Sequence, residues 1–454
     1  MVFTLISLSI LNIIGSGMLL RRRDHRIVVN LDNIIIFAFI FIFSFLLPFD
    51  YFYACTHNAT GRYLIVLSDF QENEFLVYYI LEYLFLFVLV NFFRKIYREH
   101  GENCCMTRNC SLPCYFIFTV YMLMIIGIIS DFLYLKAYGG YFNYLKYAGL
   151  IRSGVFVVDN PYSFLIAFRG FVVLSSILFL VLVDKRNVFH KIFFLFSILY
   201  SLFILYSNKG RLSLILYVLV FPIYFIFKRK QWQTLNISTI IWSVVGLLVF
   251  LGFIQLCGQL LDRSTSANIF ETIASESAFP FVNFKLLINN DIEYRFFSDI
   301  ISYPIFILPS SIWSKIYPTV ASDILTIYLN GSKKGSGGVF GEAPADILSL
   351  SYMQLNVLGV IVVAALSAIV IALVFKQLKK IKNDNLRIIL KIYLIMYLVL
   401  QSIFYGDSYN IVQRMFPLFS FLLLYVFNRF IYCSLHRRKS VQFTKKGSYG
   451  FRDS

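Results

Sequence analysis

Charged residues are scarce in this sequence of 454 residues: Asp, Glu, Lys and Arg make up 14% of it, whereas hydrophobic residues make up 59%. A soluble domain of this length needs more polar side chains to cover its surface. The mean hydropathy, +0.74, is typical of a membrane protein. The apolar runs are continuous and close to the roughly 20 residues that cross a bilayer as a helix, which excludes the shorter, alternating strands of a β-barrel.

Several motifs are informative because they are missing. Only five His residues occur, and only His57 falls in a segment predicted outside, so a general base on that face is expected to be Asp or Glu. The seven Cys residues are irregularly spaced without paired CxxC units, so we expect no metal site and no cofactor. The sequence has no Walker-type glycine loop and no internal repeat, which argues against ATP coupling and weakens the case for a secondary transporter.

About eleven apolar segments predict an all-α polytopic membrane protein with one integral membrane domain over residues 1–454. The first segment is apolar before Arg21, Arg22 and Arg23, so it is expected to be an uncleaved helix rather than a signal peptide. The candidate helices are Val2–Leu20, Asn33–Tyr53, Phe75–Phe93, Pro113–Tyr134, Ser163–Val183, Ile192–Ser207, Leu212–Phe227, Ser238–Cys257, Gln354–Phe375, Ile388–Tyr405 and Met415–Phe430.

Basic residues alternate between the two faces in a way that predicts the orientation. With the N-terminus outside and the C-terminus cytoplasmic, the basic clusters share the cytoplasmic face, as the positive-inside rule requires. The net charge of +17 is therefore expected to meet anionic lipid headgroups, and we expect no nucleic-acid partner. The clusters are Arg21–Arg26, Arg94–Arg108, Lys185–Lys191, Lys228–Lys230, Lys376–Lys391 and Arg429–Arg452.

The largest predicted outer loop is Gly258–Met353, and its composition is not that of a disordered segment, because it is rich in Phe, Ile and Tyr. Within it, Phe296–Trp313 is apolar but is broken by Asp299 and two prolines. If this stretch crossed the membrane, every later loop would change sides. We therefore expect it to be a re-entrant or interfacial segment.

Basic side chains at the outer helix ends are candidates for binding a diphosphate. An ionisable group within the membrane is costly and is normally retained for a ligand or a pathway. Arg suits a diphosphate because its fork binds two oxygens at once. The alternative for any one of them is snorkelling to the lipid headgroups. The candidate binding residues of this kind are Arg152, Arg169, Lys209, Arg211, Arg263 and Arg414.

Acidic side chains supply the candidates for proton transfer. The stretch Ser332–Asp346 is rich in Gly and ends in Glu342 and Asp346, either of which could accept a proton from a sugar hydroxyl. The alternative is a flexible loop whose acids begin the next helix. Glu82 and Asp131 lie within predicted helices, as a proton relay would require, although pairing with Arg169 as part of the structure is the favoured interpretation.

Four short stretches carry a resemblance to a known family. They are Tyr138-Gly139-Gly140-Tyr141 through Arg152, Asn208-Lys209-Gly210-Arg211, Leu308-Pro309 through Trp313 to Gly337-Gly338-Val339-Phe340-Gly341-Glu342 and Gly359, and Gly406-Asp407 before Arg414. In these stretches, and in its whole architecture, the chain resembles the bacterial oligosaccharide repeat-unit polymerases, the O-antigen polymerases called Wzy. The high Phe, Ile, Tyr and Asn content is also similar to that family.

The resemblance implies a glycosyltransferase-C-like fold in the bacterial inner membrane, with a periplasmic active face. It implies transfer of a growing glycan from undecaprenyl diphosphate to an incoming lipid-linked repeat unit. A chain-length regulator and a flippase are the implied protein partners. The basic residues, together with Asp407, would then bind the lipid-linked substrates, while Glu342 or Asp346 would activate the acceptor. The alternatives are a flippase for the same lipids and a surface-sugar acyltransferase, which normally uses a His with Ser or Glu, whereas the outer face offers only His57.

Overall fold

The structure is a computed structural model that describes residues 1–23, 26–28, 30–57, 61–97, 112–153, 156, 158–183, 188–208, 211–228, 234–235, 269–308, 310–339, 342–381 and 383–447. These residues are predominantly helical. Three short antiparallel strands, β1 (Arg22–Arg23), β2 (Arg26–Val28) and β3 (Thr234–Leu235), pair in that order, with Arg22 opposite Ile27 and Ile27 opposite Leu235.

The first half of the chain forms helices of very different lengths. They are α1 (Val2–Met18), α2 (Leu31–Phe41), the π-helix η1 (Ile42–Leu46), α3 (Leu47–Thr56), α4 (Arg62–Ser68), α5 (Glu72–Ile96), α6 (Cys114–Lys136), α7 (Tyr141–Ser153), the 3-10 helix η2 (Ser163–Arg169), α8 (Gly170–Val183), α9 (Val188–Ser207) and α10 (Arg211–Lys228).

The second half begins with short helices and ends with long ones. They are α12 (Ile269–Ser277), α13 (Phe279–Asn289), α14 (Ser298–Ile301), the 3-10 helix η4 (Ile305–Ile307), α15 (Ser310–Ile316), α16 (Ala321–Asn330), α17 (Ile347–Leu378), α18 (Asp384–Leu394), the π-helix η5 (Ile395–Leu400), α19 (Gln401–Phe404) and α20 (Ser408–Gly447).

Eight helices of the described residues are long and apolar enough to cross a membrane, and two further apolar helices, Val2–Met18 and Leu212–Phe225, are shorter. These ten correspond to ten of the predicted segments, and the remaining one, Ser238–Cys257, lies outside the described residues. The eight are Asp32–Thr56, Glu72–Ile96, Cys114–Lys136, Ser163–Val183, Val188–Ser207, Ile347–Leu378, Asp384–Phe404 and Ser408–Tyr432. The chain is thus a polytopic helical membrane protein, whereas the exact number of spans and their sidedness stay predictions.

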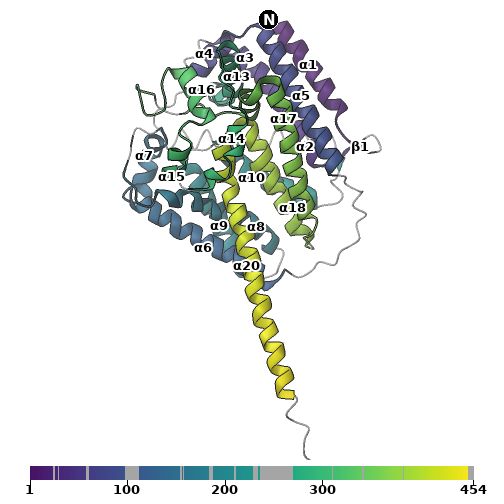
Figure 1. Ribbon diagram of the computed structural model, residues 1–454, viewed down its shortest axis with the longest axis vertical. Helices are drawn as coiled ribbons and strands as arrows, with labels where there is room; N and C mark the ends of the chain where they lie inside the picture. The colour runs from purple at the N-terminus through teal and green to yellow at the C-terminus, as the bar shows by residue number, and fades with distance from the viewer. Residues whose placement is uncertain are drawn as a thin grey trace, which may run out of the picture.

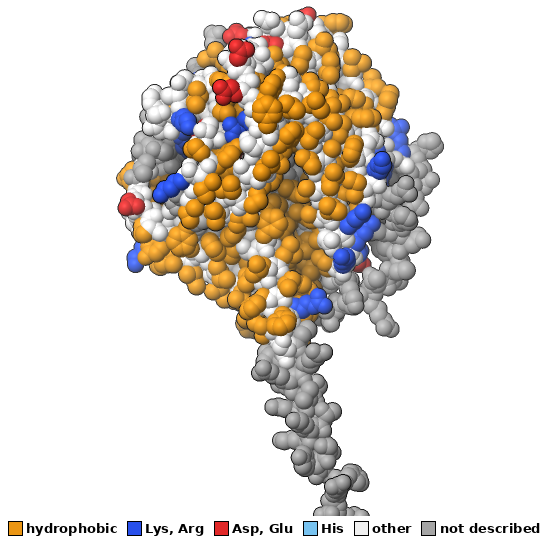
Figure 2. All heavy atoms as spheres, in the orientation of Figure 1, with side chains coloured by type: hydrophobic (Ala, Val, Ile, Leu, Met, Phe, Trp, Pro, Cys, Tyr) orange, Lys and Arg blue, Asp and Glu red, His pale blue; other side chains and the backbone are white. Residues whose placement is uncertain are grey.

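The face of the bundle that Figure 2 shows is largely apolar, as contact with lipid requires. Large side chains such as Phe3 and Leu423 are 82% and 70% exposed. Figure 1 shows the N-terminus at one end, near α4, α13 and α16, whereas α20 runs to the opposite end. Helices α4, α13 and α16, which belong to segments that the sequence predicts outside, thus lie at the end away from the C-terminus.

The interior is held by close helix packing. Helix α5 packs along α17, and α6 packs against α8 and α20. Gly127 permits the α6–α8 contact, because a Cβ added there would lie 2.6 Å from a methyl group of Val172. The resulting apolar core runs through most of the described helices.

Helix α17 is two helices joined at a sharp break. Leu355 and Asn356 have non-helical backbone angles, and Asn356 has a φ of 53°. The backbone N–H groups of Arg295 and Phe296 donate to the carbonyls of Met353 and Gln354 at 3.0 and 3.1 Å, so the end of the first helix is satisfied. The break allows a loop from outside the bundle to dock where the long apolar part of α17 begins.

The segment Phe296–Trp313 forms only the short pieces α14, η4 and the start of α15, and none of the membrane-length helices includes it. Its Asp299 and Phe306 are buried, whereas Ile301 and Ile307 are 74% and 58% exposed. This pattern is typical of a segment that lies along a membrane surface. Its predicted re-entrant or interfacial position stays a prediction.

Candidate functional site

Glu342 and Asp407 lie together at the start of α16, held by one residue. The Ser322 hydroxyl donates to Oε1 of Glu342, and its backbone N–H donates to Oδ2 of Asp407 at 3.1 Å. Tyr409 of α20 also donates its hydroxyl to Oε1 of Glu342, at 3.0 Å. Glu342 is half-buried and Asp407 is fully buried. The arrangement therefore places one accessible carboxylate beside one enclosed carboxylate.

The local sequence explains why α16 begins here. Asp323 accepts the backbone N–H of Val320 at 3.3 Å, which closes the first turn of the helix. The N–H of Ser322 in that turn donates to Asp407, whose carboxylate suits a helix N-terminus. Even so, burial raises the pKa of Asp407 to about 7, and the charges of Glu342 and Asp299 add to this rise.

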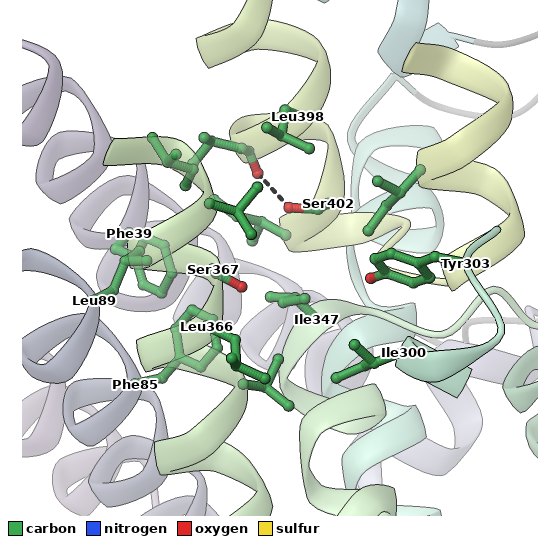
Figure 3. A pocket seen from close by; sticks show the side chains of 16 residues that line it. Phe39, Phe85, Leu89, Ile300, Tyr303, Ile347, Leu366, Ser367, Leu398 and Ser402 are labelled. Atoms are coloured by element: carbon green, nitrogen blue, oxygen red, sulfur yellow. Dashed lines mark hydrogen bonds between the residues drawn. The ribbon is translucent and has the colours of Figure 1, made fainter. Parts of the chain in front are cut away.

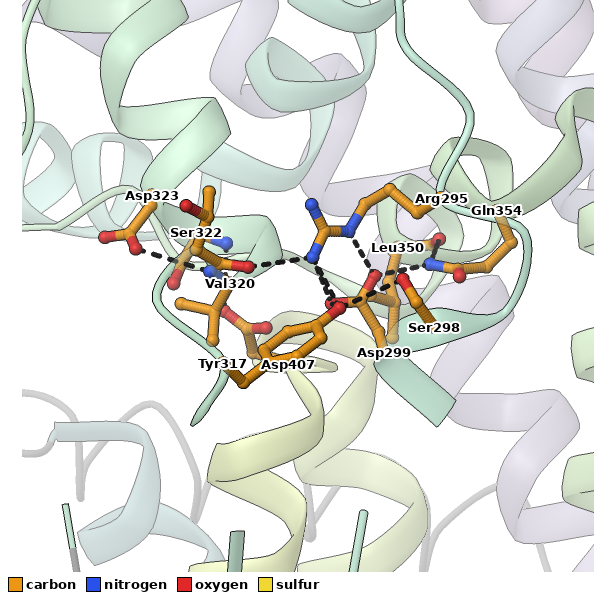
Figure 4. Close-up of polar contacts among 11 residues, drawn as sticks. Arg295, Ser298, Asp299, Tyr317, Val320, Ser322, Asp323, Leu350, Gln354 and Asp407 are labelled. Atoms are coloured by element: carbon orange, nitrogen blue, oxygen red, sulfur yellow. Dashed lines mark hydrogen bonds and ion pairs between the residues drawn. The ribbon is translucent and has the colours of Figure 1, made fainter. Parts of the chain in front are cut away.

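A second network fixes the loop that approaches this site (Figure 4). Nε and Nη2 of Arg295 bond the two carboxylate oxygens of Asp299 at 2.5 and 3.0 Å. Nη2 also donates to the hydroxyl of Tyr317 at 2.6 Å, and Gln354 donates to Asp299 at 2.9 Å. Neither Arg295 nor Asp299 was a predicted site residue, although their i, i+4 spacing was the available signal. Their mutual satisfaction indicates a structural role.

Asp346 caps α17. Its Oδ2 accepts the backbone N–H groups of Leu348 and Ser349 at 3.2 and 3.0 Å. Burial raises the pKa of Asp346 to about 7 despite these bonds. The alternative in which an acid merely begins the next helix therefore describes Asp346 well. Since one oxygen is already occupied by the cap, Asp346 is a weaker candidate for the base than Glu342.

The backbone brings Asp346 and Asp407 side by side. The N–H of Gly406 donates to the carbonyl of Ala345 at 2.7 Å. A Cβ added at Gly406 would lie 2.5 Å from the backbone nitrogen of Ile347, so this approach requires glycine. Two of the stretches that carry the family resemblance, one around Glu342 and one at Gly406–Asp407, thus meet in space.

Arg414 is half-buried on α20 and is only lightly bonded within the described residues. Its Nη1 donates to the carbonyl of Tyr405 at 3.3 Å, and its guanidinium carbon lies 5.0 Å from the centre of the Tyr405 ring. No carboxylate of the described residues forms an ion pair with it, although Asp407 contributes to its electrostatic surroundings. Most of its donors can therefore serve a ligand.

Arg169 is in a very different environment, because it is only 1% exposed and its donors are occupied. It forms an ion pair with Asp131 at 2.5 Å and donates to Asn208 and Ser207 at 2.8 and 3.1 Å. Tyr144 lies against its guanidinium as well. The favoured pairing of Asp131 with Arg169 is confirmed, and a diphosphate would have to displace these partners.

The remaining predicted binding residues are not described. Lys209 and Arg263, and the side chains of Arg152 at the end of α7 and Arg211 at the start of α10, lie outside the described residues. The predicted cysteine cluster does so as well, apart from Cys114. The sites that the structure describes are therefore Glu342, Asp346, Asp407, Arg414 and Arg169.

An apolar cavity of about 110 Å³ lies next to the acidic site (Figure 3). Its lining includes Tyr303, Ile347 and Ile411. In sequence, these residues closely follow Asp299, Asp346 and Asp407, respectively. The hydroxyl of Tyr303 lies beside Ser408, in the electrostatic field of Asp299 and Asp407. On the other side, Leu366 and Val370 of α17 line the cavity and are 40% and 51% exposed, so it reaches the lipid-facing surface. The remaining lining residues are Phe39, Phe85, Leu89, Ile300, Val363, Ser367, Ile371, Leu398, Val399, Ser402 and Ile403.

No protein-family model, no curated protein and no solved structure matches the chain. The chemistry of the site has to be argued from its own geometry. It combines an accessible carboxylate, a buried carboxylate that titrates near neutral pH and a lightly bonded Arg with an apolar cavity that opens towards lipid. Such a site can bind an amphipathic anion and remove a proton beside it.

Proposed function

We propose that this chain is a membrane glycosyltransferase that polymerises undecaprenyl-diphosphate-linked oligosaccharide repeat units at the periplasmic face of a bacterial inner membrane. The observation that carries the proposal is the shared wall between the apolar cavity and the polar site, formed by Tyr303, Ile347 and Ile411. A lipid-linked sugar needs both environments, because its isoprenoid chain is apolar while its diphosphate and sugars are polar.

Arg414 is the residue that would bind the diphosphate of the donor. As the glycosidic bond to the diphosphate breaks, negative charge builds up on the leaving oxygen. A guanidinium already in place stabilises that charge without reorganisation. The sparse bonding of Arg414 in the described residues supports this role, whereas the occupied donors of Arg169 support a structural one.

Glu342 would take the proton from the acceptor hydroxyl. The acceptor oxygen attacks the anomeric carbon of the growing glycan, the bond from that carbon to the diphosphate oxygen breaks, and undecaprenyl diphosphate leaves with the electron pair. Ser322 and Tyr409 position the Glu342 carboxylate through their hydroxyl groups. Asp407 accepts the backbone N–H of Ser322 and so holds the residue whose hydroxyl positions Glu342.

Deletion of the gene in its own host tests the proposal. Gel analysis of the surface polysaccharide should then show a single repeat unit on the lipid anchor, with the long ladder lost. Loss of every outward repeat unit would instead indicate the flippase, which the buried carboxylate Glu82 would suit. An unchanged ladder would contradict the polymerase. Plasmid-borne wild-type chain should restore the ladder, and Glu342→Gln should not.

A further inference from the structure

Helix α1 carries a polar stripe in an otherwise apolar sequence. Ser9, Asn12 and Ser16 are spaced at three and four residues, so they lie on one face of the helix, and all three are buried. The opposite face is apolar, with Phe3 and Leu11 exposed. Polar groups inside a membrane are costly and normally line an internal polar site.

The stripe faces a set of hydroxyl groups on two neighbouring helices. The amide of Asn12 donates to Ser44 Oγ at 3.1 Å, and the Ser16 hydroxyl donates to Asn12 Oδ1 at 3.1 Å. Ser9 lies 2.8 Å from the hydroxyl of Tyr79 on α5. Ser44 belongs to the π-helix η1, and such widened turns occur frequently at functional sites.

Glu82 lies next to this stripe and is 0% exposed. Neither carboxylate oxygen has a hydrogen-bond partner among the described residues, although Asn12 faces it. No described basic side chain forms an ion pair with it. Two other acids buried within spans have partners: Asp131 pairs with Arg169, and Asp50 accepts the Ser277 hydroxyl at 2.9 Å. An ionised Glu82 would be an uncompensated buried charge, and this favours the neutral carboxyl group.

The other ionisable groups around α5 are occupied elsewhere. At one end Asp32 pairs with Arg94 at 2.6 Å, and at the other Glu74 lies 3.7 Å from Lys285. Between Tyr352 and Lys376, α17 carries no ionisable residue, and η1 carries none. Tyr79 and Tyr78 are the ionisable neighbours of Glu82 on α5 itself.

Tyr78 extends the polar track towards the functional site. It lies one turn before Glu82 and is fully buried, with its ring 4.9 Å from that of Phe284. Its hydroxyl has no hydrogen-bond partner among the described residues. Both Glu82 and Asp346 are close enough to act on it electrostatically. Asp346 also has one oxygen without a partner in the described part of the chain.

We propose that Glu82 is a proton-binding site inside the membrane-spanning part of the protein, and that Tyr78 connects it to Asp346. A tyrosine hydroxyl can donate to one carboxyl group while it accepts from another, so it can carry a proton between them. The site does not depend on the polymerase proposal, because it follows from the unpaired carboxyl and the polar stripe of α1.

Dicyclohexylcarbodiimide is the probe, since it enters from lipid and adds to protonated carboxyl groups. The full-length protein in lipid nanodiscs is labelled over a pH series, and peptides are quantified by mass spectrometry. Glu82 should be labelled, with labelling falling as pH rises, and Glu82→Gln should lose it. Asp131 is the matched control, because Arg169 occupies its carboxyl group and it should stay unlabelled. Absence of Glu82 labelling throughout the pH series would overturn the proton site.

Two further measurements separate the parts of the proposal. Added sodium should leave the labelling of Glu82 unchanged. Protection of Glu82 by sodium would show that the site binds a metal cation rather than a proton. If Tyr78 couples the two carboxyl groups, a negative charge on Asp346 opposes ionisation of Glu82, and Asp346→Asn removes that charge while it retains a helix-capping side chain. The midpoint of labelling should then fall by about one pH unit. An unchanged midpoint would overturn the connection to Asp346.

Discussion

Arg414 and Arg169 should respond in opposite ways to the same substitution. In Arg414→Ala, the protein loses one hydrogen bond to a carbonyl and one contact with the Tyr405 ring. Such losses cost about 1 to 2 kcal/mol of folding free energy. If Arg414 stabilises the leaving diphosphate, its removal costs about 3 to 4 kcal/mol in the transition state, or roughly 10²- to 10³-fold in rate. We expect normal protein level with polymerisation nearly lost.

In Arg169→Ala, the expected loss is in folding. Asp131 would remain as a buried carboxylate without its cation, which costs about 3 to 5 kcal/mol. The membrane level and melting temperature should fall sharply. Changing Asp131→Asn in the same chain should restore much of the level, because the stranded charge is removed. This rescue is the signature of a structural ion pair.

The assay is polymer length on a gel, normalised to the amount of protein in the membrane by immunoblotting. Wild-type polymer from Arg414→Ala at normal protein level would refute the role of Arg414 in binding diphosphate. A normal level of Arg169→Ala with polymerisation lost would refute the structural assignment and restore Arg169 as a ligand. Arg414→Lys should recover only part of the activity, since Lys lacks the two-pronged donor.

The remaining predictions concern the acidic site and the cavity. Activity should rise as pH increases through about 7, because burial raises the pKa of Asp407 to about 7 and its ionised form accepts more strongly from Ser322, which positions Glu342. Asp407→Asn should flatten this rise, and a retained rise would argue against it. Because its pKa is raised on folding, Asp407 stabilises the fold while it is protonated. This contribution is lost as pH rises through about 7. Asp407→Asn, which stays neutral, should therefore melt at a higher temperature than the wild type at pH 8. Gly406→Ala should lower the melting temperature, because its Cβ would meet the backbone of Ile347 at a cost of about 1 to 3 kcal/mol, whereas an unchanged value would contradict the close approach. Ser402→Phe should fill the cavity and block polymerisation at a normal protein level. Ile307→Phe, at the exposed surface, should leave polymerisation intact. Full activity of Ser402→Phe would exclude a lipid-binding site in the cavity.

The helices were largely predictable because membrane spans are set by long apolar runs. Ser163–Val183 has the same bounds in the prediction and in the structure, since charged residues at both ends limit the apolar run. The break in α17 was not predicted. Leu355 and Asn356 interrupt the helix where Arg295 and Phe296 dock on its free carbonyls, and that contact joins positions some sixty residues apart.

The site was predictable in residue type but less so in role. Glu342 was chosen from one stretch and Asp407 and Arg414 from another, and the fold brings all three to one region. The difference between Arg414 and Arg169 could not be read from the sequence, because it depends on how many partners each guanidinium meets. The network of Arg295 and Asp299 was missed for the same reason: an i, i+4 pair is common on helices and does not reveal its other partners.

The most direct test of the proposed activity is reconstitution. The purified full-length chain is placed in liposomes with undecaprenyl-diphosphate-linked repeat units from the host, and products are separated by length. The account predicts a ladder of polymers with one undecaprenyl diphosphate released for each bond formed, and no ladder with Glu342→Gln. Unchanged single repeat units in the presence of folded wild-type protein would contradict the account.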